Sequence, residues 1–226
     1  SLDDAMALAR HVRANPPLEF SGIAFYPGHI REPVTAQDAA LERLRHKVVE
    51  AIEAFTSAGM PPAVVSGGST PTMWRSHEIT GVTEIRPGTY VYNDRTTAEI
   101  GACSWADCAL TVLATIVSTA VPGQAVIDAG AKALGREPMR GANGEGWGAL
   151  LDRPEVVVAR MSEEHGILDL SKTDWRPRVG ELVRVVPNHV CIVTHLNDVI
   201  FGVRGDEVET SWPVDARGRG YGLLIG

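Results

Sequence analysis

The sequence lacks several features that would place it in a specialised class of protein. It has no run of about 18 or more apolar residues, so no membrane span is expected, and its opening residues lack the basic-then-apolar order of a signal peptide. Its three cysteines, Cys103, Cys108 and Cys191, are too few for a disulfide scaffold and cannot all pair within the chain. We therefore expect a cytoplasmic protein with reduced thiols, in which Cys191 is available as a ligand.

The chain also has no excess of positive charge. Its 21 Lys and Arg against 28 Asp and Glu give a net charge of -7, and the basic residues are scattered rather than gathered in a stripe. This argues against nucleic acid as a partner and favours small-molecule chemistry. The 226 residues, 44% hydrophobic and 22% charged, are typical of a soluble globular protein with room for two structural units.

Residues 1–100 show the alternation of strands and helices that is typical of a parallel α/β unit. Ser1, followed by Asp3 and Asp4, predicts the start of a helix. Strands are expected within residues 18–26 and at residues 63–66 and 82–85, with an amphipathic helix at residues 35–58. Three strands are too few to close a parallel barrel, so we expect this chain to be the C-terminal portion of a longer protein.

Residues 101–226 show a different pattern, in which short β-rich runs are separated by turn-forming residues. Strands are expected at residues 110–117, 125–128, 156–161, 181–186, 190–195 and 199–203, with an irregular insertion at residues 134–151. The pattern predicts a second, mainly antiparallel β domain. The expected fold class is therefore α/β plus all-β, with a boundary between about residues 95 and 108.

His189 and Cys191 are two strong transition-metal ligands within an apolar, β-branched run. On a strand, residues i and i+2 lie on one face, so the pair would present an imidazole and a thiolate side by side. His195 would lie too far along such a strand to reach the same ion. Two protein donors leave positions open to water or substrate, as in a catalytic site. The alternative is a histidine and a cysteine that only pack in the sheet.

A second candidate site is the loop Ser66-Gly67-Gly68-Ser69-Thr70-Pro71-Thr72, which follows a predicted strand and leads into a predicted helix N-terminus. Glycine lets backbone N–H groups approach a phosphate, hydroxyl groups add donors, and the helix dipole favours an anion. No Walker lysine follows the glycines. An ordinary turn is the alternative interpretation.

Six motifs, taken in order, resemble those of D-serine dehydratases and D-threonine aldolases. They are residues 65–72, residues 84–94, Asp128-Ala129-Gly130, Ser162-Glu163-Glu164-His165-Gly166, Pro187-Asn188-His189-Val190-Cys191 and Trp212-Pro213-Val214-Asp215-Ala216-Arg217-Gly218. The resemblance covers essentially the whole chain. It implies a fold-type III enzyme, in which residues 1–100 are the C-terminal part of a pyridoxal-phosphate-binding, alanine-racemase-like TIM-type barrel and residues 101–226 are the β domain.

The resemblance also implies roles for individual residues. Gly68, Ser69 and Thr70 would hold the phosphate of pyridoxal phosphate, with Tyr90 beside it, and His189 and Cys191 would hold the metal. Tyr26 and His29 would line the pocket, and His165 would support the metal or contact substrate unless it lies in an exposed acidic turn. The Schiff-base lysine of the family is expected upstream of this chain, because none of the three lysines matches it: Lys47, Lys132 and Lys172. The isolated chain is therefore expected to be inactive.

The implied activity is that of a lyase acting on β-hydroxy D-amino acids. In the resembled family, dehydratases carry His-x-Cys with zinc, whereas D-threonine aldolases carry His-x-Asp with manganese or magnesium. Cys191 therefore favours dehydration of D-serine or 3-hydroxy-D-aspartate to a 2-oxo acid and ammonia. The alternatives are an aldolase that gives glycine or glyoxylate-derived products and a non-catalytic chain that binds pyridoxal phosphate or metal. A homodimer is expected for the full-length form.

Overall fold

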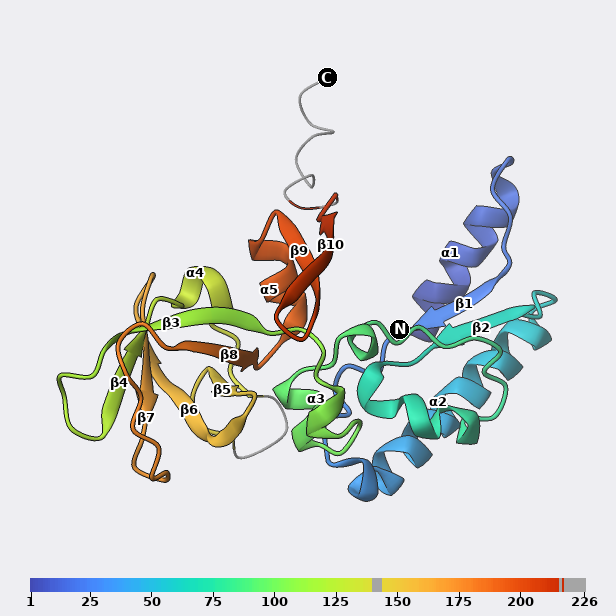
Figure 1. Ribbon diagram of the computed structural model, residues 1–226. Helices are drawn as coiled ribbons and strands as arrows, with labels where there is room; N and C mark the ends of the chain where they lie inside the picture. The colour runs from blue at the N-terminus through green and yellow to red at the C-terminus, as the bar shows by residue number, and fades with distance from the viewer. Residues whose placement is uncertain (140–143, 216, 218–226) are drawn as a thin grey trace. The chain divides into compact units, whose positions relative to one another are not determined.

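The computed structural model of the protein describes residues 1–139, 144–215 and 217, and the chain divides into two compact units (Figure 1). The first unit comprises Ser1–Tyr90 and Ile100–Ala102, and the second comprises Val91–Glu99 and Cys103–Gly226. Each unit has a hydrophobic core of its own.

The first unit is built on a pair of parallel strands. β1 (Gly22–Phe25) pairs with β2 (Val64–Gly67), with Phe25 opposite Gly67. The 3-10 turn η1 (Val34–Ala36) and the long helix α2 (Asp38–Ser57) connect the two strands. The predicted apolar face of α2 packs against the strand pair through Ala40, Leu41, Leu44 and Val48. The α/β alternation predicted from the sequence is therefore confirmed.

Helix α1 (Leu2–Ala14) begins as predicted. The Ser1 hydroxyl accepts the Asp4 N–H at 3.2 Å and donates to the Asp4 carboxylate at 2.8 Å, which satisfies the helix N-terminus. Ala9 is buried in a cluster with Phe55, on whose ring Phe20 stacks with centroids 5.5 Å apart.

The strand predicted at residues 82–85 is reduced to a single parallel bridge between Ser66 and Glu84. The Thr83 hydroxyl accepts the Val65 N–H at 2.9 Å and so takes a place that a strand carbonyl would occupy. Pro87, which has no N–H, then prevents the segment from continuing the ladder. The 3-10 segments η2 (Thr70–Glu78) and η3 (Thr89–Val91) flank this bridge in the sequence.

The second unit contains a closed barrel of six strands in the order β3-β4-β7-β6-β5-β8, in which every neighbouring pair is antiparallel. The strands are β3 (Val112–Ser118), β4 (Gln124–Ile127), β5 (Gly148–Leu150), β6 (Arg153–Met161), β7 (Gly166–Asp169) and β8 (Leu182–Pro187). The core is fully buried and consists mainly of β-branched and leucine side chains, including Ile116, Ile127, Val156, Val158, Leu168 and Val185. The mainly antiparallel β domain is therefore confirmed.

Two barrel strands were not predicted. β5 lies within residues 134–151, where the sequence indicated an irregular insertion, and residues 140–143 of that stretch lie outside the described residues. β5 has three residues, all buried, and β7 has four. Such short runs show too little alternation to be identified from the sequence.

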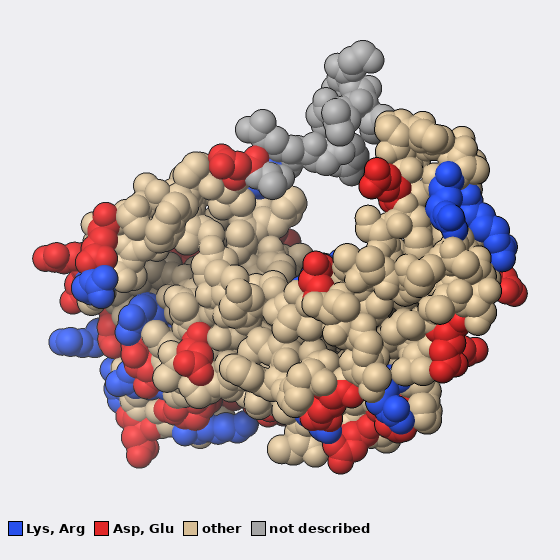
Figure 2. Space-filling model, turned by 90° about the vertical axis from the view of Figure 1, so that its right-hand side faces the viewer, with Lys and Arg blue, Asp and Glu red and all other residues tan. Residues whose placement is uncertain are grey.

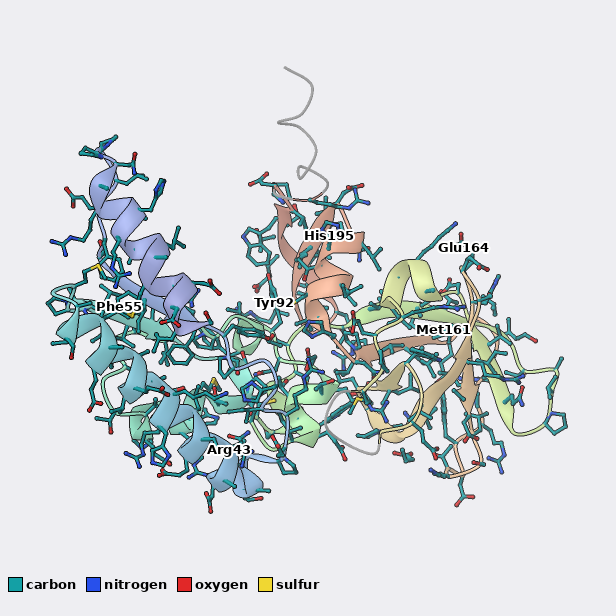
Figure 3. The ribbon with its side chains drawn as sticks, turned by 180° about the vertical axis from the view of Figure 1, so that it is seen from behind. Arg43, Phe55, Tyr92, Met161, Glu164 and His195 are labelled. Atoms are coloured by element: carbon teal, nitrogen blue, oxygen red, sulfur yellow. The ribbon has the colours of Figure 1, made fainter. Side chains whose placement is uncertain are left out.

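The segment predicted as a strand at residues 190–195 is a helix, α5 (Val190–Leu196), and this corrects the sequence interpretation. Its β-branched residues suggested a strand, but Val190 and Val193 are buried at helical i, i+3 spacing. His195 therefore lies one helical turn beyond Cys191 and not far along a strand (Figure 3).

The remaining elements of the second unit are short. α3 (Arg95–Glu99) and η4 (Trp105–Asp107) precede the barrel, and α4 (Ala131–Leu134) follows β4. β9 (Val199–Arg204) and β10 (Glu207–Pro213) form an antiparallel ribbon. In the part of the chain that the structure describes, no helix is long and apolar enough to cross a membrane. On the face drawn in Figure 2, acidic and basic side chains lie interspersed in small groups.

Candidate functional site

The loop that presents His189 is held in place by the buried side chain of Asn188. The Asn188 amide nitrogen donates to the Glu137 and Gly146 carbonyls at 3.0 and 2.9 Å. The Thr96 hydroxyl donates to the Asn188 carbonyl at 2.7 Å. These bonds fix the backbone between the end of β8 and the start of α5.

The His189 side chain is paired with Asp94. The His189 Nδ1 and Asp94 Oδ2 atoms are 3.0 Å apart, and the side chains are 25% and 0% exposed respectively. The same carboxylate oxygen accepts the Val190 N–H at 3.2 Å, at the first residue of α5. Asp94 therefore contacts both the imidazole and the start of the helix that carries Cys191.

Cys191 lies on the first turn of α5 and its residue is exposed. The structure brings it close to His189. The hydrogen bond with the Asp94 carboxylate, followed by the interaction with Cys191, raises the pKa of His189 to about 9. The predicted pair is thus adjacent, although a helix N-terminus and not a strand positions it.

The donor set fits a divalent metal ion with open positions. Imidazole and thiolate are suitable ligands for zinc, and a carboxylate on the second ring nitrogen is the usual support for a metal-binding histidine. Among the described residues, no group of three or more His, Cys, Asp or Glu is arranged to hold an ion. A site at His189 and Cys191 would therefore draw two protein donors from the described residues.

The candidate phosphate-binding residues Gly68, Ser69 and Thr70 are in the first unit and are buried. Gly68 has φ of +125°, a conformation that favours glycine, and Ser69 and Thr70 are 5% and 3% exposed. Among the described residues, the backbone N–H groups of Gly68 and Thr70 have no hydrogen-bond acceptor in the protein. Since buried N–H groups normally have partners, these two donors at the start of η2 fit an anion such as phosphate.

Two tyrosines predicted near the cofactor lie differently. The Tyr90 N–H donates to the Thr70 hydroxyl at 3.2 Å, which brings Tyr90 to the loop, and its residue is half exposed. Tyr26 follows β1, at the same edge of the strand pair as Gly68, but is 76% exposed with its ring over Gly28. The structure therefore joins Tyr90 to the loop and leaves Tyr26 exposed beyond the end of β1.

The lysines and the acidic turn have other surroundings. Lys47 is exposed on α2, and Lys172 lies 3.9 Å from Glu145. Lys132 pairs with Glu164 at 2.5 Å in the exposed turn that also carries His165 (Figure 3). Ala216 and Gly218, from the last of the six motifs, lie outside the described residues.

Sequence reasoning missed Asp94 as a site residue. It ends the motif at residues 84–94, and the one available signal was its place before Thr97, which is typical of a helix cap. Its partner His189 is 95 positions away in the sequence, so only the fold reveals the pair.

Profiles of two protein families match consecutive parts of the chain. The alanine racemase N-terminal domain matches residues 1–96, and the putative serine dehydratase domain matches residues 109–203. D-threo-3-hydroxyaspartate dehydratase of Delftia sp. is 37% identical over 77% of this chain and 50% of its own length. The chain belongs to the D-serine dehydratase and D-threonine aldolase family.

Other members of the family extend the likeness. 3-hydroxy-D-aspartate aldolase of Paracoccus denitrificans is 31% identical over 95% of this chain and 55% of its own length. The structure of D-threonine aldolase from Filomicrobium marinum superposes with a TM-score of 0.80 at 30% identity, covering 96% of this chain and 58% of that one. The alanine-racemase-like fold is thus shown, and the chain spans about half the length of the curated relatives it matches.

The Delftia dehydratase has also been solved as the wild type and as variants. The wild type superposes with a TM-score of 0.80 at 31% identity, covering 94% of this chain and 61% of its own. One variant has alanine in place of a histidine, and another has alanine in place of the cysteine two positions later and is described as metal-free. In the dehydratase, a histidine and the cysteine two positions later have thus each been replaced by alanine, and the cysteine variant has been solved in a metal-free form.

Proposed function

We propose that the protein carrying this chain is a pyridoxal-phosphate- and metal-dependent lyase of β-hydroxy D-amino acids. Its favoured reaction is dehydration of D-serine or 3-hydroxy-D-aspartate to a 2-oxo acid and ammonia. One observation carries the proposal: His189 and Cys191 are adjacent, and Asp94 supports the imidazole at 3.0 Å. The His-x-Cys spacing of the variants of the Delftia dehydratase supports the same interpretation.

In this proposal, residues of the second unit would hold the metal and residues of the first unit would hold the cofactor phosphate. His189 and Cys191 would hold the metal, which when bound supplies a Lewis acid for the β-hydroxyl group of the substrate. Gly68, Ser69 and Thr70 would hold the phosphate of pyridoxal phosphate, which when bound supplies an electron sink. The thiolate of Cys191 favours zinc over manganese or magnesium, which prefer oxygen ligands.

The proposal includes the organisation of the protein. Residues 1–100 would be part of the barrel and residues 101–226 the β domain, with Tyr90 beside the phosphate and Tyr26 at the pocket rim. The lysine that binds the cofactor would lie outside this chain, which by itself would therefore be inactive. A cytoplasmic homodimer is proposed for the complete enzyme.

The alternative is a retro-aldol lyase acting on D-threonine or 3-hydroxy-D-aspartate. It is favoured by the relatives named as aldolases, which align over 95–96% of this chain at 27–31% identity. Cys191 argues for dehydration, but the ligand type alone does not select the substrate.

A product assay separates the two reactions. The whole translated product that contains this chain is incubated with D-serine, D-threonine and 3-hydroxy-D-aspartate, in the presence of pyridoxal phosphate and Zn²⁺. We expect ammonia and a 2-oxo acid as the main products, with loss of activity in Cys191→Ala and after chelation. An aldolase would instead give glycine and an aldehyde from D-serine or D-threonine, and glycine and glyoxylate from 3-hydroxy-D-aspartate, as the main products.

A further inference from the structure

Asp94 is a fully buried residue in the second unit, and both of its carboxylate oxygen atoms have hydrogen-bond partners. Its Oδ1 atom accepts the Thr97 N–H at 2.9 Å and the Thr97 hydroxyl at 3.0 Å. Its Oδ2 atom faces His189 Nδ1 at 3.0 Å and accepts the Val190 N–H at 3.2 Å. Because a buried charge is stable only when it is paired and hydrogen-bonded, this arrangement fixes the carboxylate firmly.

The position of Asp94 is set by the start of α3. The Asp94 N–H donates to the Thr97 hydroxyl at 2.8 Å, and the Thr97 N–H donates back to the Asp94 carboxylate, as in a reciprocal helix cap. Asn93, just before it, has φ of 53°, which asparagine tolerates, and donates to the Asp107 carbonyl at 3.2 Å. One carboxylate therefore joins the N-termini of α3 and α5.

This geometry selects one nitrogen of the His189 ring. A carboxylate acceptor at Nδ1 holds the proton on Nδ1, which leaves Nε2 as the atom that can bind a ligand. The same oxygen holds the Val190 N–H, so it also fixes the backbone between His189 and Cys191. A single oxygen atom thereby controls the ring orientation and the backbone that separates the two donors.

We propose that Asp94 is the positioning residue of the metal site, which makes His189 ligate through Nε2 and holds the α5 N-terminus that carries Cys191. The inference rests on the proposed function, namely that His189 and Cys191 bind a divalent ion.

Two variants of the 226-residue chain separate positioning from helix capping. Asp94→Asn keeps the size of the side chain but replaces one acceptor oxygen with an NH₂ donor. This NH₂ group must face either the donors of Val190 and His189 or the Thr97 N–H, so one of these hydrogen bonds is lost. Thr97→Val is the matched control, because it removes a hydroxyl from the same cap and leaves the contacts of Asp94 with His189 and Val190 intact. Thermal unfolding of both variants reports how far each loses stability.

The experiment measures metal binding and does not depend on catalytic activity. Zn²⁺ affinity is measured by competition with a chromophoric chelator, and Co²⁺ binding by its thiolate charge-transfer absorption. Measured at pH 9, where competition from the His189 proton is small, Asp94→Asn should bind Zn²⁺ about 10- to 100-fold more weakly than wild type, the usual effect of removing such a support, and Thr97→Val should bind like wild type. Wild-type affinity in Asp94→Asn, or an equal loss in Thr97→Val, would overturn the proposal.

A nitrogen NMR spectrum of the wild-type chain tests the tautomer without any variant. With Zn²⁺ bound, the proton should be on His189 Nδ1 and the metal on Nε2; the reverse would refute the role of Asp94. The variants His189→Ala and Cys191→Ala show which part of the proposal is wrong if Asp94→Asn does not weaken zinc binding. If both bind Zn²⁺ as wild type does, the proposed metal pair itself is wrong. If both lose Zn²⁺ while Asp94→Asn keeps it, only the role of Asp94 is wrong.

Discussion

Zinc binding by this chain should depend strongly on pH, because the metal must displace a proton from His189. The hydrogen bond with Asp94, followed by the interaction with Cys191, raises the pKa of His189 from 6.5 to about 9. Metal binds only the unprotonated ring, so the raised pKa weakens binding below pH 9 and the affinity recovers as the pH rises. At pH 7, two units below the pKa, protonation of His189 lowers the apparent affinity for Zn²⁺ by about 100-fold.

The assay is chelator competition at several pH values between 6.5 and 9, with calorimetry in buffers of different ionisation enthalpy to count the protons released. The His189 proton alone should make the affinity rise about tenfold per pH unit until about pH 9. Asp94→Asn is the comparison, because it removes the main cause of the raised pKa and leaves the Cys191 thiol in place. Its affinity should rise less steeply above pH 7. Equal slopes in the two proteins would contradict the reasoning.

Three further predictions concern the fold, the thiols and the cofactor. Gly22→Ala should destabilise the chain by about 2–3 kcal/mol in denaturant unfolding, because the new Cβ would overlap the Val64 carbonyl. Gly88→Ala is the control and should have little effect, because no atom lies near its Cβ. Equal stabilities of the two variants would contradict the β1–β2 register. Burial raises the pKa of Cys108 to about 12, so iodoacetamide at pH 8 should label exposed Cys191 and reach Cys108 only after unfolding, as peptide mapping would show. Treatment with pyridoxal phosphate and then borohydride should leave no specific, stoichiometric adduct on this chain, as mass spectrometry would show. Such an adduct on Lys47, Lys132 or Lys172 would contradict the inference that none of these lysines matches the cofactor lysine of the family.

The sequence was sufficient where one local signal determines the structure. The apolar stripe of α2 and the Ser1 cap are local patterns, and both elements form as predicted. The barrel strands β3, β6 and β8 are long enough to be identified, and the four-residue β4 carries the β-branched pair Val126 and Ile127. β5 has only three residues, and the four-residue β7 begins with glycine and ends with aspartate, which are rare in strands.

The geometry of the proposed metal site could not be predicted because long-range contacts determine it. Val190 and Val193 favour a strand by composition, but the Asp94 carboxylate caps the N-terminus of α5 and both valines bury on its inner face. The choice of His189 and Cys191 needed only their chemistry and spacing. Finding Asp94 required the three-dimensional fold, since nothing in the local sequence connects it with His189.

Anomalous diffraction at the zinc absorption edge, from crystals of the zinc-loaded chain, tests the central claim most directly. The account predicts one strong peak about 2.0–2.1 Å from His189 Nε2 and about 2.3 Å from Cys191 Sγ, with Asp94 on Nδ1 of the same ring. A peak that avoids this pair, or an ion bound to Nδ1 with Asp94 displaced, would contradict it.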